Sequence, residues 1–313
     1  DALLKSIFAA ILKIFYKVRI EGIENLPRDE RVIIVVNHVS FLDGMLLAAF
    51  LPGRLTFAVN TGIAKRWWAK IGLILVDAVS LDPTRPLAAK TLTRAVEAGR
   101  HVVIFPEGRI TVTGALMKVY EGPGMIADKT GATLVPIRID GAQYSFFSRL
   151  KGKVKQRWFP KISLTILSPR KLQVDPALQG RARRQVAGTQ LYDLMSELIF
   201  ESCDNRQTLF EALLDAKEIH GANRAVLEDT ERKPLTYGRL VASSLALGKK
   251  IARLTAPSEK VGVLLPNAVS SAITFLALQA YGRVPAMLNF TSGHLGMEGA
   301  CRVADVRRIL TSR

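Results

Sequence analysis

The sequence predicts an α/β fold in which a mostly parallel sheet is flanked by helices. First, short apolar runs alternate with longer helical segments up to about residue 168, which is typical of βαβ units. Second, the run 32–36 is wholly apolar and β-branched, as expected of a central strand covered on both faces. Third, Gly99 and Gly131 directly follow two predicted helices, a position where glycine commonly ends a helix.

The predicted elements follow one another in a regular order. The expected strands are residues 32–36, 55–59, 102–105, 133–139 and 161–167. The expected helices are residues 41–51, 65–75, 87–98, 117–130 and 181–201. Because a helix separates most successive strands, we expect the strands to pair in parallel. The helix 181–201 closes this domain, and 203–207 is the expected linker.

The first eighteen residues predict an amphipathic helix. Residues 2–18 are apolar apart from three lysines, Ser6 and Tyr16, and at about 100° per residue the lysines share roughly one third of the helical wheel. The segment is too short and too charged to cross a bilayer. We expect it to lie in a membrane interface, and packing on the protein's own core is the alternative. The lysines expected to face water are Lys5, Lys13 and Lys17, and the side chains expected to face lipid are Phe8, Ile11, Leu12 and Phe15.

A histidine and an aspartate five residues apart follow the first central strand. The strand delivers His38 to its carboxyl end, where open α/β sheets place their ligands. Asp43 falls in the first turn of the next helix, where its carboxylate can fix the imidazole tautomer and stabilise the protonated ring. Such a base suits deprotonation of a substrate hydroxyl and needs no Ser or Cys nucleophile beside it. The structural alternative is a helix start resembling a capping box, with Ser40 as the N-cap.

A second motif, residues 105–109, again follows an apolar strand, residues 102–105. Gly108 lets backbone N–H groups approach an anion closely, and Arg109 can grip a phosphate through its planar fork. By itself, the pair Glu107 and Arg109 could instead close a turn by a surface ion pair. The two motifs together predict a base that acts on a phosphate-bearing alcohol.

At these residues the chain resembles the PlsC-type glycerolipid acyltransferases. Their signature is Asn-His-x-x-x-x-Asp followed by Phe-Pro-Glu-Gly, and residues 134–139 resemble the family's Val-Pro strand. Most members place a Thr between the Gly and the Arg, which are adjacent here. Many also carry an Arg in an intermediate motif, for which Arg85 is the expected substitute. The signature residues are Asn37, His38, Asp43 and 105–108; the resemblance implies catalysis by His38 and Asp43 and phosphate binding by Glu107, Gly108, Arg109 and Arg85.

Within the family, residues 105–111 and 81–84 look like those of bifunctional bacterial members. Those enzymes join the acyltransferase domain to an adenylate-forming acyl-[acyl-carrier-protein] synthetase. The resemblance implies acyl transfer from acyl carrier protein to the free hydroxyl of 2-acylglycerophosphoethanolamine, in phospholipid reacylation. It implies no cofactor for acyl transfer, and ATP with Mg for the adenylating activity.

The last third of the chain resembles the opening of an adenylate-forming domain, with a helix ending at Leu254, a strand at 261–265 and a helix ending near Ala280. In that family the nucleotide loop and catalytic lysine lie hundreds of residues later. We therefore expect residues 290–296 to form a connecting turn rather than a phosphate loop. The expected domains are an interfacial helix at 1–20, the acyltransferase domain at 21–202 and a fragment of the synthetase domain at 203–313.

The formal charge of +17 lies mainly in the part that bears the motifs. Residues 1–200 contain 29 Lys and Arg against 16 Asp and Glu, with a peak at 149–161. Nucleic acid, an anionic membrane and an acidic acyl carrier protein would all fit such a segment, and a solvated basic loop is the structural alternative. Because no nucleic-acid-binding motif accompanies the charge, we expect a membrane or a carrier. The residues assigned to this contact are Lys151, Lys153, Lys155, Arg157, Trp158, Phe159, Trp67 and Trp68.

Composition restricts the remaining classes. Two cysteines, Cys203 and Cys301, predict neither a disulfide framework nor a metal cluster, and the four histidines show no ligand spacing. No metal site is therefore expected. From the lipid chemistry that the resemblance implies, we expect the protein at the cytoplasmic face of a bacterial inner membrane. The alternative function is a basic lipid- or nucleic-acid-binding module in which the His–Asp pair is structural.

Overall fold

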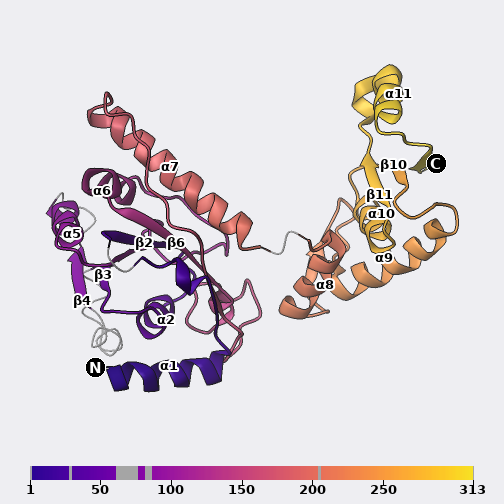
Figure 1. Cartoon of the computed structure of the whole chain (residues 1–313). Coiled ribbons are helices and arrows are strands. Elements are labelled where there is room, and N and C mark those ends of the chain that lie inside the picture. The colour runs from indigo at the N-terminus through magenta and orange to yellow at the C-terminus, as the bar shows by residue number, and fades with distance from the viewer. Residues whose placement is uncertain (1, 28–29, 61–76, 82–86, 204–205, 313) are drawn as a thin grey trace. The chain divides into compact units, whose positions relative to one another are not determined.

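The computed structural model describes the chain except residues 1, 28–29, 61–76, 82–86, 204–205 and 313 (Figure 1). It divides into two compact units, residues 1–205 and 206–313, which are described separately below. The sequence places the domain boundary at 202/203. The predicted helix 65–75 with Trp67 and Trp68 lies outside the described residues, as does Arg85.

Within the described residues, the first unit is built on a seven-stranded sheet of order β1-β7-β6-β2-β5-β3-β4. All neighbouring strands pair in parallel except β6 and β7, which confirms the predicted fold class. Neither β1 nor β4 is among the predicted strands. The strands are β1 (Arg19–Glu21), β2 (Val32–Val36), β3 (Thr56–Asn60), β4 (Asp77–Leu81), β5 (Val102–Ile104), β6 (Thr133–Asp140) and β7 (Ser163–Ile166).

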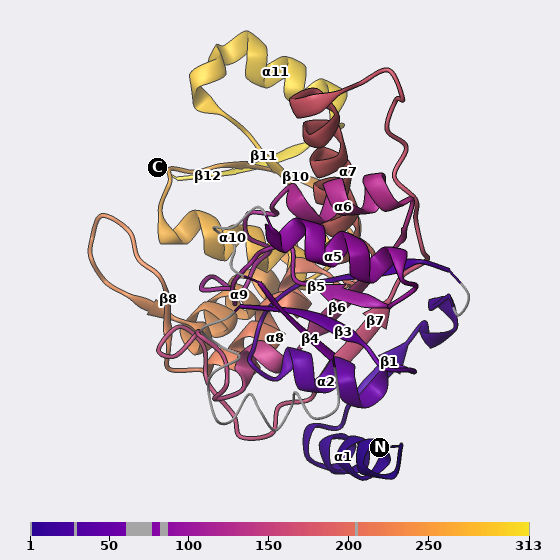
Figure 2. The ribbon, with the colours of Figure 1, turned by 90° about the vertical axis from the view of Figure 1, so that its left-hand side faces the viewer.

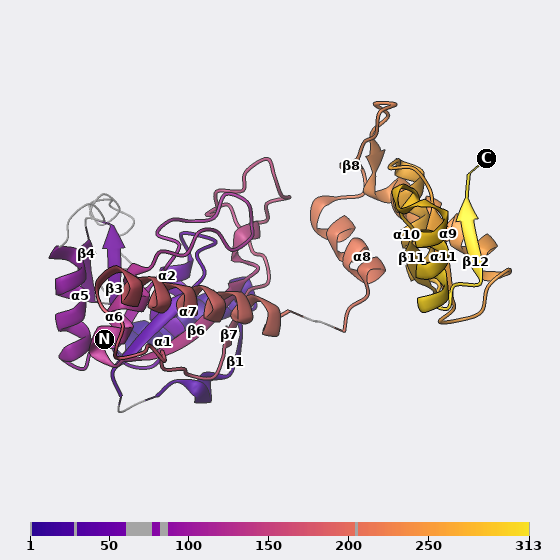
Figure 3. The same ribbon diagram turned by 90° about the horizontal axis from the view of Figure 1, so that it is seen from above.

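Helices cover both faces of this sheet, with α1 and α2 on one side and α5 and α6 on the other (Figure 2). On the second side, α7 runs along the sheet over β6 (Figure 3). The helices are α1 (Ala2–Tyr16), α2 (Asp43–Phe50), α5 (Leu87–Glu97), α6 (Gly122–Thr130) and α7 (Gly180–Glu201).

Strand β2 is the centre of the unit. Its five residues are buried, and it lies between β5 and β6. Because side chains alternate along a strand, Val32, Ile34 and Val36 join the core beneath α1 and α2. Ile33 and Val35 join the core beneath α5, α6 and α7. A wholly apolar run is therefore what this position requires.

The predicted helix 117–130 begins later than expected, at Gly122. Before that point, the Met117 N–H donates to Glu107 Oε2 at 2.9 Å and the Tyr120 N–H donates to the Pro106 carbonyl at 2.9 Å. These bonds hold the backbone in an extended course along the second motif. The helix begins beside Pro123, because proline is tolerated in the first turn of a helix but would break a helix that started at 117.

Helix α1 does not take the predicted orientation. Leu12 is buried and Phe8 packs against the core, whereas Ile11 and Phe15 are exposed. Lys5 turns inward and donates to the carbonyls of Leu51 and Gly53, and its partial burial lowers its pKa. One face of α1 therefore packs on the protein while another leaves apolar side chains exposed. No helix among the described residues is long and apolar enough to cross a membrane.

The second unit contains a three-stranded parallel sheet of order β11-β10-β12 and a short β8–β9 hairpin. Its core is small, formed by Ile251, Val261, Val263, Ala277 and Leu278. The predicted turn at 290–296 ends at Ser292, because Gly293 begins a helix. The elements are α8 (Leu209–His220), β8 (Ala225–Leu227), β9 (Leu235–Thr236), α9 (Tyr237–Ala252), β10 (Lys260–Leu264), α10 (Val269–Ala280), β11 (Val284–Met287), α11 (Gly293–Val303) and β12 (Arg308–Thr311).

Candidate functional site

The two sequence motifs meet at the carboxyl ends of β2 and β5. These strands are parallel neighbours, with Val35 paired to Ile104, so the loops that follow them emerge at the same edge of the sheet. The His38 N–H donates to Glu107 Oε1 at 3.0 Å, and the Thr111 N–H donates to the His38 carbonyl at 2.8 Å. The second loop thus holds the backbone of His38 on both sides.

His38 and Asp43 form a close pair, with 2.8 Å between Nδ1 and Oδ2. A carboxylate at Nδ1 favours the tautomer that keeps its proton there and leaves Nε2 as the acceptor. The imidazole stacks on the Phe105 ring, with centroids 4.1 Å apart and planes inclined by 21°. The His38 side chain is 16% exposed, while that of Asp43 is fully buried. The ring is therefore oriented from two directions and still reaches solvent.

Asp43 also organises the loop between the two residues. Its Oδ2 accepts the N–H groups of Val39 and Ser40 at 2.7 and 2.9 Å, and its Oδ1 has no hydrogen-bond partner among the described residues. The bond from Ser40 is one half of a capping box; the other half is absent, because Ser40 Oγ accepts from Leu42 rather than from Asp43. The carboxylate therefore orients the histidine and starts α2 with one oxygen.

Asn37 is a site residue whose role the sequence did not specify. Its side chain donates to the Ile139 carbonyl at 2.9 Å and accepts the Ile139 N–H at 2.8 Å. These two bonds extend the pairing of β2 with β6 by one residue and fix the backbone just before His38. The sequence signals were a polar residue directly after a central strand and the place of Asn37 in the family signature.

Glu107 joins the two loops from inside the protein. Its side chain is 2% exposed, and its two oxygens accept the N–H groups of His38 and Met117. Burial raises the pKa of Glu107, and the two backbone hydrogen bonds act in the opposite direction. This geometry gives Glu107 a supporting role beneath the loops rather than a direct contact with a phosphate in solvent.

The turn formed by Gly108 and Arg109 differs in part from the prediction. Gly108 has a φ of +65°, and a Cβ there would lie 3.3 Å from the Tyr120 ring, so glycine is required. The expected use of its N–H for a phosphate is wrong, because that N–H donates to the Phe105 carbonyl at 3.0 Å. The Arg109 side chain is exposed, and its guanidinium makes no ion pair within the described part of the chain.

The basic segment packs against both motif loops. The Arg149 guanidinium lies 5.8 Å from the centroid of the Phe41 ring, and Lys153 donates to the Val112 carbonyl at 2.6 Å. The Lys153 ammonium therefore already donates one hydrogen bond within the protein. The other predicted contact residues in this segment, which are also exposed, are Lys151, Lys155, Arg157, Trp158 and Phe159.

An aromatic patch, defined here as Phe15, Phe146, Trp158 and Phe159, lies on the surface of the first unit. The Phe15 and Phe159 centroids are 4.8 Å apart, and those of Phe146 and Trp158 are 4.5 Å apart. All four side chains are between 46% and 66% exposed. The patch connects the exposed apolar face of α1 with the basic segment.

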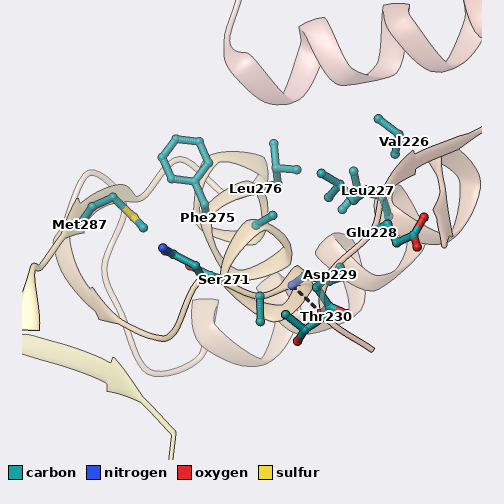
Figure 4. A pocket seen from close by; sticks show the side chains of 14 residues that line it. Val226, Leu227, Glu228, Asp229, Thr230, Ser271, Phe275, Leu276 and Met287 are labelled. Atoms are coloured by element: carbon teal, nitrogen blue, oxygen red, sulfur yellow. Dashed lines mark hydrogen bonds between the residues drawn. The ribbon is translucent and has the colours of Figure 1, made fainter. Parts of the chain in front are cut away.

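A separate hollow of about 860 Å³ lies in the second unit (Figure 4). Its walls are mainly apolar and include Leu227, Phe275 and Met287. At one side, Asp229 Oδ2 accepts the N–H of Val269, the first residue of α10, at 3.1 Å. None of the predicted site residues lines this hollow.

Residues 17–140 match the family model described as Acyltransferase. The chain is 36% identical over 132 residues to the chloroplastic 1-acyl-sn-glycerol-3-phosphate acyltransferase LPAT1 of Arabidopsis thaliana, a match covering 41% of this chain and 37% of that protein. It is 25% identical over 189 residues to the 1-acyl-sn-glycerol-3-phosphate acyltransferase alpha of Homo sapiens, covering 56% and 65%. The chain spans less than two thirds of the length of either relative.

A structural likeness is also found to the crystal structure of the 1-acyl-sn-glycerophosphate acyltransferase PlsC from Thermotoga maritima. It has 22% sequence identity and a TM-score of 0.43, and covers 63% of this chain and 83% of that one. The family match contains His38, Asp43 and residues 105–109. Both motifs therefore lie inside the part of the chain that is similar to the acyltransferases.

Proposed function

We propose that the first unit transfers an acyl group from a thioester to the free hydroxyl of a lysophospholipid. The observation that supports this most is the 2.8 Å contact between His38 and a fully buried Asp43, in a loop that Glu107 of the second motif holds in place. A histidine oriented in this way is a general base. The family match over the same residues names the chemistry as acyl transfer.

In the proposed reaction, His38 Nε2 takes the proton of the acceptor hydroxyl as its oxygen attacks the thioester carbonyl. A C–O bond forms, the C–S bond breaks, and the departing thiolate takes the proton back from the imidazolium. Asp43 stabilises the imidazolium between these steps. The thioester supplies the activation, so the step needs no covalent acyl-enzyme and no cofactor.

The acceptor phosphate is proposed to bind at Arg109, whose guanidinium is free to form a bidentate contact. Arg85 remains a proposed second contact and lies outside the described residues. Neither the Arg109 nor the Ile110 N–H donates a hydrogen bond to a described residue. These two N–H groups are candidates to donate hydrogen bonds to the thioester oxygen and so stabilise the negative charge that develops on it.

The specific substrates rest on resemblance. The bifunctional enzymes suggest 2-acylglycerophosphoethanolamine as the acceptor and acyl carrier protein as the donor, whereas the relatives' names specify 1-acyl-sn-glycerol-3-phosphate. Initial rates with both acceptors, each with acyl carrier protein and coenzyme A thioesters, would decide between them. The first acceptor is a phosphodiester and the second a phosphomonoester. A rate with 2-acylglycerophosphoethanolamine below about a hundredth of the rate with 1-acyl-sn-glycerol-3-phosphate would contradict the ethanolamine lipid as the acceptor.

The second unit is proposed to begin an adenylate-forming domain that uses ATP and Mg. This rests only on the likeness of residues 233–289 to that family. The described residues contain no group of three His, Cys, Asp or Glu side chains that could hold a metal ion. We therefore assign no step involving ATP or Mg to these residues.

The surface of the first unit supports a membrane partner, which we place at the cytoplasmic face of a bacterial inner membrane. The aromatic patch continues into exposed apolar side chains of α1, with lysines and arginines around it, and such a surface suits an anionic interface. The double substitution of Trp158 and Phe159 by Ala should weaken binding to anionic vesicles about tenfold. Phe200→Ala, which removes an exposed aromatic side chain of α7, is the control and should leave binding unchanged.

The test of the enzyme itself is thioester-dependent acylation of a lysophospholipid by the wild type and by His38→Ala. Equal rates would show that His38 is not the general base and would favour a structural role for the His–Asp pair. Binding to oligonucleotides but not to anionic vesicles would instead favour a nucleic-acid-binding module.

A further inference from the structure

Residues 115–120 return along the Gly108–Arg109 turn. Thr111 Oγ1 donates to the Ala115 carbonyl at 3.0 Å, which closes the loop between the two stretches. The bonds from Met117 to Glu107 and from Tyr120 to Pro106 then hold the returning chain beside the second motif. A residue between Met117 and Tyr120 is therefore held next to the proposed phosphate site, although it is about ten positions away in sequence.

Tyr120 forms a wall of this turn. A Cβ at Gly108 would lie 3.3 Å from its ring, so the ring lies directly against the glycine. The Tyr120 side chain is 53% exposed. The Lys118 ammonium lies 5.2 Å from the centroid of the same ring, a distance at which a cation is attracted to an aromatic face. The ring thus lies between the Gly108 turn and the Lys118 ammonium and keeps this cation beside the turn.

The charge of Lys118 is not neutralised by the carboxylates nearest to it in sequence. Glu107 is buried and accepts two backbone N–H groups, and Glu121 pairs with Arg184 at 3.2 Å. Lys118 is exposed, and no described carboxylate lies within ion-pair distance of it. Two exposed cations, Arg109 and Lys118, therefore belong to the loop around one glycine turn and form no ion pair with a described carboxylate.

We infer that Lys118 is a second binding residue for the acceptor phosphate, held in place by Tyr120. This inference rests on the proposed acyl transfer and adds a specificity-determining residue to it. A phosphomonoester carries a charge of about −1.5 to −2 at pH 7, whereas a phosphodiester carries about one negative charge. Two cations therefore favour a monoester acceptor more than one cation does, and Lys118 contributes to selection by the charge of the acceptor.

The test compares Lys118→Ala, Lys118→Arg and Lys129→Ala in the full chain, with acceptors presented in neutral detergent micelles. Lys129 is an exposed lysine at the end of α6 and controls for the loss of one positive charge. Lys118→Ala should raise the KM for 1-acyl-glycerol-3-phosphate about five- to tenfold and leave kcat within about twofold of the wild type. Lys118→Arg should restore most of the loss.

The same variants should show a smaller KM change, about two- to threefold, with the diester acceptor 2-acylglycerophosphoethanolamine. Inorganic phosphate should inhibit Lys118→Ala more weakly than the wild type. An unchanged KM in Lys118→Ala, or an equal change in Lys129→Ala, would overturn the inference. If His38→Ala is inactive in the same assay, the proposed acyl transfer stands even when the inference fails.

Discussion

The loop after β2 and the loop after β5 emerge at the same edge of the sheet, but they differ in which of their charged side chains are buried and which are exposed. After β2, Asp43 is fully buried and accepts three hydrogen bonds from the loop and the imidazole. After β5, Glu107 is buried in the same way, whereas Arg109 and Lys118 are exposed. In the loop after β2, the buried charge is satisfied by hydrogen bonds within the protein. In the loop after β5, two exposed cations can bind a ligand.

This difference separates positioning from binding. A buried carboxylate is tolerated only when hydrogen bonds replace its lost hydration, so Asp43 and Glu107 act on the protein's own backbone. Exposed cations keep their hydration until a ligand replaces it. We therefore expect substitutions in the first loop to lower kcat and substitutions of the exposed cations to raise KM.

The largest expected effect is that of His38→Ala. Removing the general base should lower kcat about 10³- to 10⁴-fold, with little change in the KM for the lysophospholipid. The measurement is steady-state acyl transfer at saturating thioester. His101→Ala is the matched control, because His101 is a half-buried histidine of the same unit whose backbone carbonyl, not its ring, accepts from Thr56. A comparable loss in His101→Ala would show that the effect reports stability rather than catalysis.

Asp43→Asn should lower kcat about 10²- to 10³-fold. The amide oxygen can still accept the N–H groups of Val39 and Ser40, so the loop can keep its course. Because the same oxygen of Asp43 also faces His38 Nδ1, an amide that keeps these bonds presents its oxygen to the imidazole and its nitrogen to the position of Oδ1. The proton then stays on Nδ1, but the neutral amide no longer stabilises the imidazolium that forms during the reaction. The imidazole signals in an NMR spectrum should show the same tautomer as in the wild type, and a shift of the proton to Nε2 would contradict this account.

Arg109→Ala should act mainly on binding. Loss of a charge-assisted contact to phosphate should raise the KM for the lysophospholipid about tenfold or more, with kcat within about threefold. Arg109→Lys keeps the charge but not the planar fork, and should recover only part of the affinity. A fall in kcat at unchanged KM would place Arg109 with the catalytic loop and remove the contrast between the two loops.

The positions of the two motifs were largely predictable from the sequence, because each motif directly follows a strand that its apolar residues reveal. The apolar runs 32–36 and 102–105 placed His38 and Glu107 at two strand ends, and the parallel pairing of β2 with β5 brings these ends to the same edge of the sheet. What was missed depends on contacts between distant residues. Glu107 holds the N–H of Met117 in the stretch before α6, and no local pattern in residues 117–121 reveals that bond.

The orientation of α1 shows the same limit. Its helical wheel predicts an amphipathic helix, but both Phe8 and Ile11 are apolar, and only the packed core decides which of them is buried. Lys5 turns inward because two carbonyls at the end of α2 lie within its reach. Amphipathic periodicity gives the existence of such a helix, while its rotation depends on the neighbour it packs against.

The smallest expected effect concerns Glu107, the carboxylate that joins the two loops. Because burial raises its pKa above the ordinary value of 4.5, the folded chain holds this proton more tightly than the unfolded chain. The contribution to stability is therefore full below pH 4.5 and is lost as the pH rises through the raised pKa. Glu107→Gln cannot ionise, so its free energy of unfolding should lack this decline, which amounts to about 1.4 kcal/mol for each unit of pKa shift.

Urea unfolding followed by tryptophan fluorescence between pH 4 and 7 would measure this difference. All three tryptophans of the chain precede residue 206, so the signal reports the first unit. Glu24→Gln removes an exposed carboxylate from that unit and should run parallel to the wild type. If Glu107→Gln also runs parallel, the two N–H bonds from His38 and Met117 offset the cost of burying the charge. Glu107 would then be held as firmly ionised as an exposed carboxylate, and the loop after β5 would fix its acid as fully as the loop after β2 fixes Asp43.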